Sequence, residues 1–306
     1  MEYVLQTKDL TKMYGKKAAV SGVDLHVKQG DIYGLIGKNG AGKTTLIRMV
    51  AGMANPSSGN IRLFDEEELD KQRRRTGTMI ENPAVYMNMT ARQNLKYYCC
   101  LLGMKSENEI DEMLHLVGLI DTGKKKVKNF SLGMKQRLAI AIALMGNPEF
   151  LMLDEPMNGL DPTGIKEIRE LILKLNQEKH LTILISSHIL GELSKIATRY
   201  GVINNGQLIE EFSNQELIER CESRLELKVD NTEKAAEILK NMLGAESYTI
   251  VDEGTIHIEK NFQDKIGKIN TELATHGVTV FFSSIIGEDL EAYFMQLMSR
   301  TYYSIT

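Results

Sequence analysis

Cysteine is scarce in this sequence of 306 residues. The three cysteines, Cys99, Cys100 and Cys221, are odd in number, show no CxxC spacing and have no histidine at a metal-ligand interval. The pattern argues against a disulfide framework and against a zinc site. It fits a reducing compartment.

Long apolar runs are missing as well. No stretch approaches the ~18 residues that a transmembrane helix requires, and the longest apolar segments, 138–145 and 278–282, have the length of core elements. The N-terminal residues, MEYVLQTKDL, lack the basic and then apolar pattern of a secretion signal. We therefore expect a cytoplasmic chain that reaches a membrane only through a partner.

Positive charge is not in excess. Lysine and arginine number 37 and aspartate and glutamate 41, so the net charge is −4, whereas a protein held to nucleic acid by its whole surface would be basic. No nucleic-acid partner is expected. Apolar residues make up 42% of the chain, which is enough for real cores, and the length predicts roughly two domains.

Most of the chain has the pattern of an α/β fold. Residues 1–30 alternate apolar and polar positions and end in a turn, which predicts antiparallel strands. Residues 202–210 contain Asn205-Gly206, a strong hairpin signal. Continuous apolar runs predict buried parallel strands at 32–36, 150–153 and 182–186. Helical spacing predicts helices at 44–51 and 164–179.

A stretch from about residue 82 to 146 is dominated by helical periodicity. The helices are expected over 94–102, 109–117 and 132–145. We therefore expect a helical subdomain inserted between strands of the α/β part.

The pattern changes towards the C-terminus, and all five prolines lie at or before Pro162. The later order of strand-helix-strand, strand-helix-strand and a final helix is that of a split βαβ arrangement. The expected strands are 225–229, 248–251, 255–258 and 278–283, and the expected helices are 233–242, 262–275 and 289–298. We predict one domain over 1–220 and a small ferredoxin-like α+β domain over 221–306.

Residues 37–44 match the phosphate-binding pattern G-x-x-x-x-G-K-[ST]. The glycines let backbone N–H groups turn towards a phosphate, and the helix that follows adds its positive end. Lys43 would neutralise the terminal phosphates, and the Thr44 hydroxyl would bind Mg²⁺. A chance glycine-rich turn is the weaker explanation, because a strand precedes the loop and a helix follows it. The candidate nucleotide-binding residues are Gly37, Asn39, Gly40, Ala41, Gly42, Lys43, Thr44 and Thr45.

Two carboxylates, Asp154 and Glu155, end the apolar strand at 150–153. A P-loop protein needs an aspartate at a neighbouring strand end to help hold Mg²⁺, which suits Asp154. Glu155 could polarise a water for attack on phosphorus. By itself Asp-Glu-Pro is also an ordinary sequence for the end of a strand. The P-loop earlier in the chain favours the interpretation that the two carboxylates have a role in catalysis.

Ser131 precedes the apolar helix at 132–145 and is a good N-cap. The exposed start of this helix could receive an anion. Local sequence alone favours a plain capped helix, so a role for this segment depends on the other motifs.

Together these motifs resemble the ATP-binding cassette family over about residues 3–220. Residues 158–162 resemble its D-loop, and 186–188 resemble its switch-histidine loop. Tyr14 stands where the family stacks an aromatic ring on adenine. Five motifs in family order make the resemblance highly specific.

Two motifs depart from the family pattern. The signature keeps Ser131 and Gly133 but has Leu132 and Met134 in place of glycine and glutamine. Glu81 replaces the usual glutamine of the Q-loop and is a candidate ligand of Mg²⁺. This combination, with the C-terminal extension, resembles exporters of the bacitracin-resistance and lantibiotic-immunity type.

The resemblance implies an ATP- and Mg²⁺-dependent ATPase subunit. Two cassettes would face each other head to tail, as a homodimer or heterodimer, so that Ser131 and Gly133 complete the ATP site of the opposite chain. Glu155 would be the general base and His188 would contact the γ-phosphate, with Asp161 in the D-loop. A separate transmembrane permease would hold the chain at the cytoplasmic face of the membrane.

Other functions fit the motifs less well. A ribosome-acting cassette protein would carry two P-loops, and the span between residues 44 and 131 leaves no room for the coiled coil of a repair ATPase. A nucleotide kinase would not explain the Ser131 segment or His188. The resemblance suggests an antimicrobial peptide as cargo, while a drug, lipid or ion fits the same residues.

Overall fold

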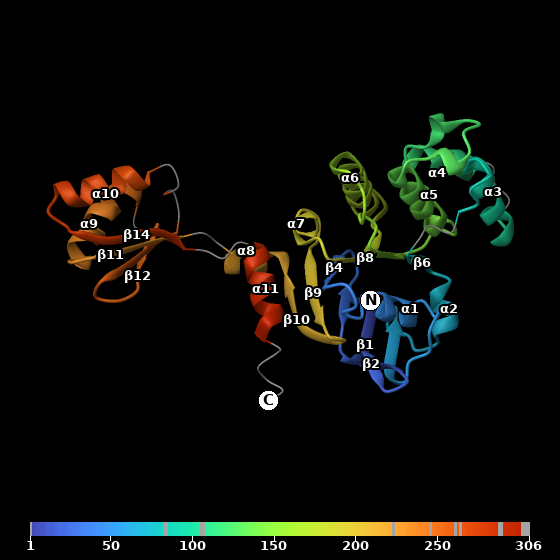
Figure 1. Cartoon of the computed structure of the whole chain (residues 1–306), viewed down its shortest axis with the longest axis horizontal. Helices are drawn as coiled ribbons and strands as arrows, with labels where there is room; N and C mark the ends of the chain where they lie inside the picture. The colour runs from blue at the N-terminus through green and yellow to red at the C-terminus, as the bar shows by residue number, and fades with distance from the viewer. Residues whose placement is uncertain are drawn as a thin grey trace. The chain divides into compact units, whose positions relative to one another are not determined.

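The chain forms two compact units in its structure, a computed structural model (Figure 1). The first unit comprises Met1–Asn214 with Met298–Thr306, and the second comprises Gln215–Leu297. The domain boundary that we predict after residue 220 falls within α8 (Asn214–Cys221) and stays a prediction. The structure describes residues 2–81, 85–104, 108–221, 224–244, 247–259, 262, 265–286 and 290–300.

A six-stranded sheet with the order β10-β9-β4-β8-β7-β6 forms the centre of the first unit. Neighbours from β9 to β6 are parallel, and β10 runs antiparallel to β9. Every residue of β4, β7 and β8 is buried, which confirms the parallel strands expected from the continuous apolar runs. The bounds are β4 (Ile32–Ile36), β6 (Thr76–Met79), β7 (Phe150–Asp154), β8 (Thr182–Ser187), β9 (Arg199–Asn204) and β10 (Gln207–Ser213).

Helices follow the inner strands of this sheet: α1 (Lys43–Val50) comes after β4, α6 (Pro162–Lys179) after β7 and α7 (Leu190–Leu193) after β8. Asp161 caps α6, since its Oδ1 accepts a hydrogen bond of 3.2 Å from the Gly164 backbone N–H, and Pro162 suits the first turn.

The N-terminal part of the chain forms an antiparallel sheet, as the alternating pattern predicts. β1 (Tyr3–Tyr14) pairs with β2 (Lys17–Val23), β3 (His26–Lys28) and β5 (Ser58–Leu63). This sheet shares a core with α1 and the central sheet. The short helix α2 (Leu69–Arg73) follows β5 and had no counterpart in the sequence pattern.

The helical subdomain is present, with α3 (Ala91–Leu101), α4 (Asn108–Leu116) and α5 (Leu132–Leu144). Ser131 caps α5, because its Oγ accepts a hydrogen bond of 3.2 Å from the Met134 backbone N–H. Residues 82–84 and 105–107 of the predicted range lie outside the described residues. None of the described helices combines the length and apolar character that crossing a bilayer requires.

The second unit has the predicted ferredoxin-like topology. Its antiparallel sheet has the order β12-β13-β11-β14, with one helix after the first strand and another after the third. The core lies between the sheet and these helices. The bounds are β11 (Arg224–Val229), α9 (Thr232–Leu243), β12 (Tyr248–Ile250), β13 (Thr255–Ile258), α10 (Ile266–Thr275) and β14 (Val280–Ile286), and α11 (Leu290–Arg300) follows.

Two expected boundaries in this unit are wrong by several residues. The helix expected from 262 begins at Ile266, and the strand expected from 278 begins at Val280 and runs to Ile286. Phe262 and Val278 are both only 2% exposed. Both side chains pack into the core although they lie outside the regular elements. Their apolar character therefore made the predicted helix and strand begin too early.

A buried hydroxyl links β4 to the edge strand β10. Tyr33 is fully buried, and its hydroxyl donates a 2.7 Å hydrogen bond to Glu211. The same carboxylate accepts from the His26 backbone N–H at 3.1 Å. Burial raises the pKa of Tyr33 well above its usual range, and the Glu211 carboxylate raises it further. The phenol therefore stays protonated and keeps its role as donor.

We predict that Glu211→Ala lowers the free energy of unfolding by about 1–3 kcal/mol, because the buried Tyr33 hydroxyl loses its acceptor. Urea unfolding followed by circular dichroism measures the change. The double variant Tyr33→Phe/Glu211→Ala should regain part of the loss, because it no longer leaves the Tyr33 hydroxyl without an acceptor. A single variant as stable as the wild type would show that the hydrogen bond is not important for stability.

Candidate functional site

The glycine-rich loop leaves the carboxyl end of β4 and leads directly into α1. Gly40 and Gly42 have φ values of 80° and 111°, a region that favours glycine. A Cβ on Gly42 would also lie 2.5 Å from the Ala19 carbonyl oxygen. No side chain caps α1, so the first N–H groups of this helix are open to a phosphate.

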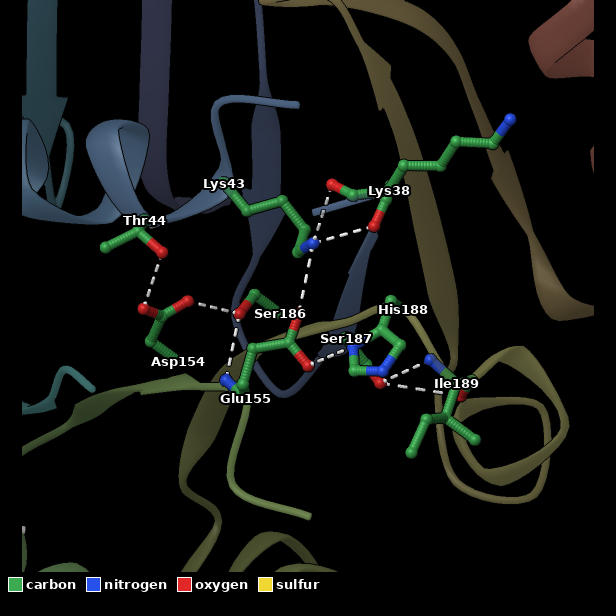
Figure 2. Close-up of polar contacts among 10 residues, drawn as sticks. Lys38, Lys43, Thr44, Asp154, Glu155, Ser186, Ser187, His188 and Ile189 are labelled. Atoms are coloured by element: carbon green, nitrogen blue, oxygen red, sulfur yellow. Dashed lines mark hydrogen bonds and ion pairs between the residues drawn. The ribbon is translucent and has the colours of Figure 1, made fainter. Parts of the chain in front are cut away.

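Lys43 is buried, with 5% of its side chain exposed. Its Nζ donates to the Gly37 carbonyl at 2.6 Å and to the Lys38 carbonyl at 3.2 Å (Figure 2). It also lies 3.0 Å from Glu155 Oε1. The ammonium is therefore fixed by the loop itself and points at the end of β7.

Asp154 is 3% exposed, and a hydroxyl donates to each of its oxygens. Thr44 Oγ1 donates to Oδ2 at 2.7 Å, and Ser186 Oγ donates to Oδ1 at 2.5 Å. β7 and β8 carry this arrangement, since Asp154 lies opposite Ser186 in their parallel register. The Asp154 carboxylate and the Thr44 hydroxyl thus place two hard oxygen ligands side by side, as a hard cation such as Mg²⁺ prefers.

These donors fit Mg²⁺ when the metal shares its coordination with phosphate. Within the described residues, no group of three or more His, Cys, Asp or Glu side chains could hold a metal by itself. Mg²⁺ is commonly bound through one or two protein oxygens with water and substrate phosphates as the other ligands. The Thr44–Asp154 pair matches that donor set.

Glu155 lies between Lys43 and His188. Its Oε1 is 3.0 Å from Lys43 Nζ, and its Oε2 is 2.8 Å from His188 Nδ1. Its backbone adopts a positive φ of 51°, which is uncommon for a residue with a side chain. The backbone N–H donates to Ser186 Oγ at 3.0 Å, so β8 holds this turn in place. Figure 2 shows the carboxylate facing both partners.

A cavity of about 490 Å³ lies against the loop. Tyr14, which is 51% exposed, forms part of its wall. The cavity brings together the predicted residues Tyr14, Asn39, Gly40, Gly42, Lys43, Thr44, Thr45 and Glu155. Gly37 and Ala41 belong to the same loop but do not line the cavity. Lys17, Ala18, Ala19, Asn205 and Gly206 complete the lining and were not predicted.

Ser131, Gly133 and Asp161 do not line this cavity. Ser131 and Asp161 act as helix caps, and a Cβ on Gly133 would lie 3.8 Å from Leu160 and from Gly164. The signature and the D-loop therefore lie beside each other in the fold, and neither contributes to the lining of the cavity. Their predicted role at a nucleotide stays a prediction.

Glu81 also lies outside the cavity lining. Its carboxylate accepts a 2.6 Å hydrogen bond from Arg48, and 58% of the side chain is exposed. Its φ is 57°. Arg48 was missed, although it stands one helical turn after Thr44 and so shares its face of α1. The role of Glu81 as a metal ligand stays a prediction.

Comparisons with known proteins agree with this geometry. Residues 20–158 match the family described as ABC transporter. The chain is 42% identical over 301 residues to the bacitracin transport ATP-binding protein BcrA of Bacillus licheniformis, covering 97% of this chain and 98% of that protein. The chain belongs to the ABC transporter family. It is an ATP-binding, ATP-hydrolysing subunit.

Further similarities extend over the cassette. The lantibiotic transport ATP-binding protein SrtF of Streptococcus pyogenes is 40% identical over 240 residues, covering 78% of this chain and 97% of that protein. The solved structure of cbiO1 from Clostridium perfringens has a TM-score of 0.65 and 26% identity, covering 79% and 96% of the two chains. A dimeric cassette, MJ0796 bound to ADP and Pi, has a TM-score of 0.62 and 25% identity, covering 69% and 98%. They confirm the predicted ABC cassette fold.

We predict that Glu81 exchanges Arg48 for the metal when ATP is bound. Arg48→Ala should then lower the Mg²⁺ concentration for half-maximal ATPase activity by roughly two- to fivefold, the range expected for an exposed ion pair. Glu81→Gln should raise it. The matched control is Arg62→Ala, which breaks another exposed pair, with Glu67 at 3.5 Å. The same metal dependence in all four proteins would exclude this exchange.

Proposed function

We propose that this ABC ATPase powers the export of a peptide antibiotic through a separate transmembrane permease, which holds it at the cytoplasmic face of the membrane. The similarity to a bacitracin transport protein carries the cargo proposal, because it extends over 97% of the chain and so includes the C-terminal unit. The lantibiotic transport relative supports the same class of cargo.

In the proposed mechanism, the glycine-rich loop binds the phosphates of ATP and Tyr14 packs against the adenine. Lys43 turns from the Gly37 and Lys38 carbonyls and from Glu155 towards the β- and γ-phosphates. Thr44 and Asp154 would hold Mg²⁺, with Glu81 as a further candidate ligand, and the bound ion would neutralise charge on the phosphate oxygens.

Loss of the Lys43 contact leaves Glu155 free to act as the base. Its carboxylate orients a water and accepts a proton as the water attacks the γ-phosphorus, while the bond from that phosphorus to the β–γ bridging oxygen breaks and ADP leaves. His188 keeps the other oxygen in place through Nδ1, at 2.8 Å, and its ring would contact the γ-phosphate. The hydrogen bond that the Glu155 backbone N–H donates to Ser186 Oγ keeps the base in position.

The other half of the site comes from a second cassette in this proposal. Ser131 and Gly133 lie away from the cavity of their own chain, and the N-terminus of α5 is available to an anion. Asp161 caps α6 beside them and fixes the neighbouring D-loop. A dimeric cassette bound to ADP and Pi is among the similar structures.

Transport by a reconstituted complex tests the cargo. The chain is purified with its permease from native membranes and placed in proteoliposomes, and ATPase activity is measured with bacitracin, with a lantibiotic and with a lipid or small drug. Stimulation by either peptide, absent when Glu155→Gln replaces the wild type, would support the proposal. Stimulation by the lipid or drug alone would assign another cargo.

We predict that Glu155→Gln reduces ATP turnover by about 10²–10⁴-fold, the usual contribution of a general base, while ATP binding stays near that of the wild type. Lys43→Ala should lose nucleotide binding instead. Isothermal titration and phosphate release separate the two effects. Near-normal hydrolysis by Glu155→Gln would assign the base to another residue.

We also predict that Ser131→Arg and Lys43→Ala proteins, each inactive alone, recover ATPase activity when mixed. A heterodimer of the two places both defects in one composite site and leaves the other site intact. Activity is measured against the mixing ratio. If Ser131 acts on the nucleotide of its own chain, both sites of the heterodimer are defective and no activity returns.

A further inference from the structure

The ring of Tyr14, which forms part of the cavity wall, has a cation beside it. Lys12 Nζ lies over this ring, 5.2 Å from the ring centroid, and an ammonium within roughly 6 Å of an aromatic face is attracted to it. Tyr14 lines the cavity, whereas Lys12 does not. The ammonium therefore approaches the ring from outside the cavity and leaves the cavity side of the ring open to a ligand.

A backbone carbonyl fixes the position of this cation. Lys12 is half-buried, and its Nζ donates a 2.6 Å hydrogen bond to the Asn55 carbonyl oxygen. Asn55 precedes Pro56, and a residue before proline is restricted to extended conformations. The carbonyl therefore has little freedom to turn away, and the ammonium belongs to the local structure of this region.

The segment that holds Lys12 connects α1 to β1. At the end of α1, the Ala54 backbone N–H donates to the Arg48 carbonyl at 3.2 Å. Further along, the Ser57 N–H donates to the Thr11 carbonyl at 2.8 Å, and Ser57 Oγ accepts from the Met13 N–H at 2.9 Å. The end of β1 is therefore held against the helix whose N-terminus would bind the phosphates, so the two ends of the nucleotide site keep a fixed separation.

A cation on one face of an aromatic ring changes what the other face can bind. The faces of a ring carry partial negative charge, so two stacked rings repel each other unless they are offset. An ammonium behind the ring draws this charge towards itself, which favours a second π-system on the opposite face. The same contact restricts the tyrosine side chain, so less conformational entropy is lost when a base stacks on it.

We propose that Lys12 is a positioning residue for nucleotide binding, which holds the Tyr14 ring and favours the stacking of adenine on the free face of that ring. The proposal rests on the proposed function, in which Tyr14 packs against the adenine. It deepens that function, because it assigns a part in base binding to a residue that lies outside the cavity lining.

A single tryptophan makes the stacking measurable, since the chain contains none. In Tyr14→Trp, the indole emission should change on titration with ATP and should not respond to inorganic tripolyphosphate, which has no base. Adding Lys12→Met, which keeps the length of the side chain without its charge, should raise the ATP concentration at half-maximal change by about two- to fivefold, the range of a cation–π interaction at an exposed site. Lys12→Arg should restore most of the affinity, because a guanidinium also stacks on aromatic faces.

The matched control is Lys28→Met in the same background. Lys28 Nζ also lies over a tyrosine ring, that of Tyr3, at 5.8 Å from the centroid, and neither residue lines the cavity. This control should leave the ATP midpoint unchanged, and thermal unfolding verifies that each variant is folded.

Calorimetry on the protein that keeps Tyr14 separates positioning from a general structural role. Lys12→Met should weaken the binding of ATP and leave the binding of tripolyphosphate unchanged, because the phosphate end of the site is intact. A purely structural role of Lys12 would weaken both.

Two results would overturn the proposal. One is the same ATP midpoint with Lys12 and with Lys12→Met, and the other is an equal loss of affinity for ATP and for tripolyphosphate. Failure of the proposed function gives a different result, in which calorimetry detects ATP binding to Tyr14→Trp while the indole emission does not respond. The adenine would then lie elsewhere, and the role of Lys12 would be overturned with it.

Discussion

Buried charge is the constraint on which the first unit depends. Lys43, Asp154 and Glu155 lie together at the carboxyl ends of β4 and β7, with exposed fractions of 5%, 3% and 18%. An uncompensated buried charge is strongly destabilising, so each group is held by partners: carbonyls and Glu155 for Lys43, two hydroxyls for Asp154. In the proposed function, a triphosphate would take the place of the Lys43 partners, and Mg²⁺ would be a further partner of Asp154, so that both charges would stay compensated.

The order of the strands in the central sheet supplies the partners that these buried charges need. β8 lies between β4 and β7, and the parallel register places Ser187 opposite Ile36 and Ser186 opposite Asp154. The end of β8 can therefore supply Ser186 to Asp154 and to the Glu155 backbone, while the next residues carry His188 to the Glu155 carboxylate. Segments far apart in sequence meet here because the carboxyl ends of parallel strands share one edge of the sheet.

Sequence predicted the parts of the site that are contiguous. The glycine-rich loop, the Asp154-Glu155 pair and the cap at Ser131 each depend on local geometry, which is encoded within one short segment of the sequence. The interactions across the fold were missed: the bond between Ser186 and Asp154 depends on strand register, and Arg48 reaches Glu81 from a helix 33 positions away in the chain. The ferredoxin-like order was predictable from alternation, whereas the start of α10 was not, because Phe262 contributes to the core from outside the helix.

The N-terminus of α5 combines a local cap with further donors. Ser131 Oγ accepts a hydrogen bond from the Met134 backbone N–H, which satisfies one of the first N–H groups of the helix. The other N–H groups of the first turn have no partner within the helix and can receive an anion. In the proposed function this anion is the γ-phosphate of the ATP bound to the opposite chain, so pairing of the cassettes would depend on the nucleotide.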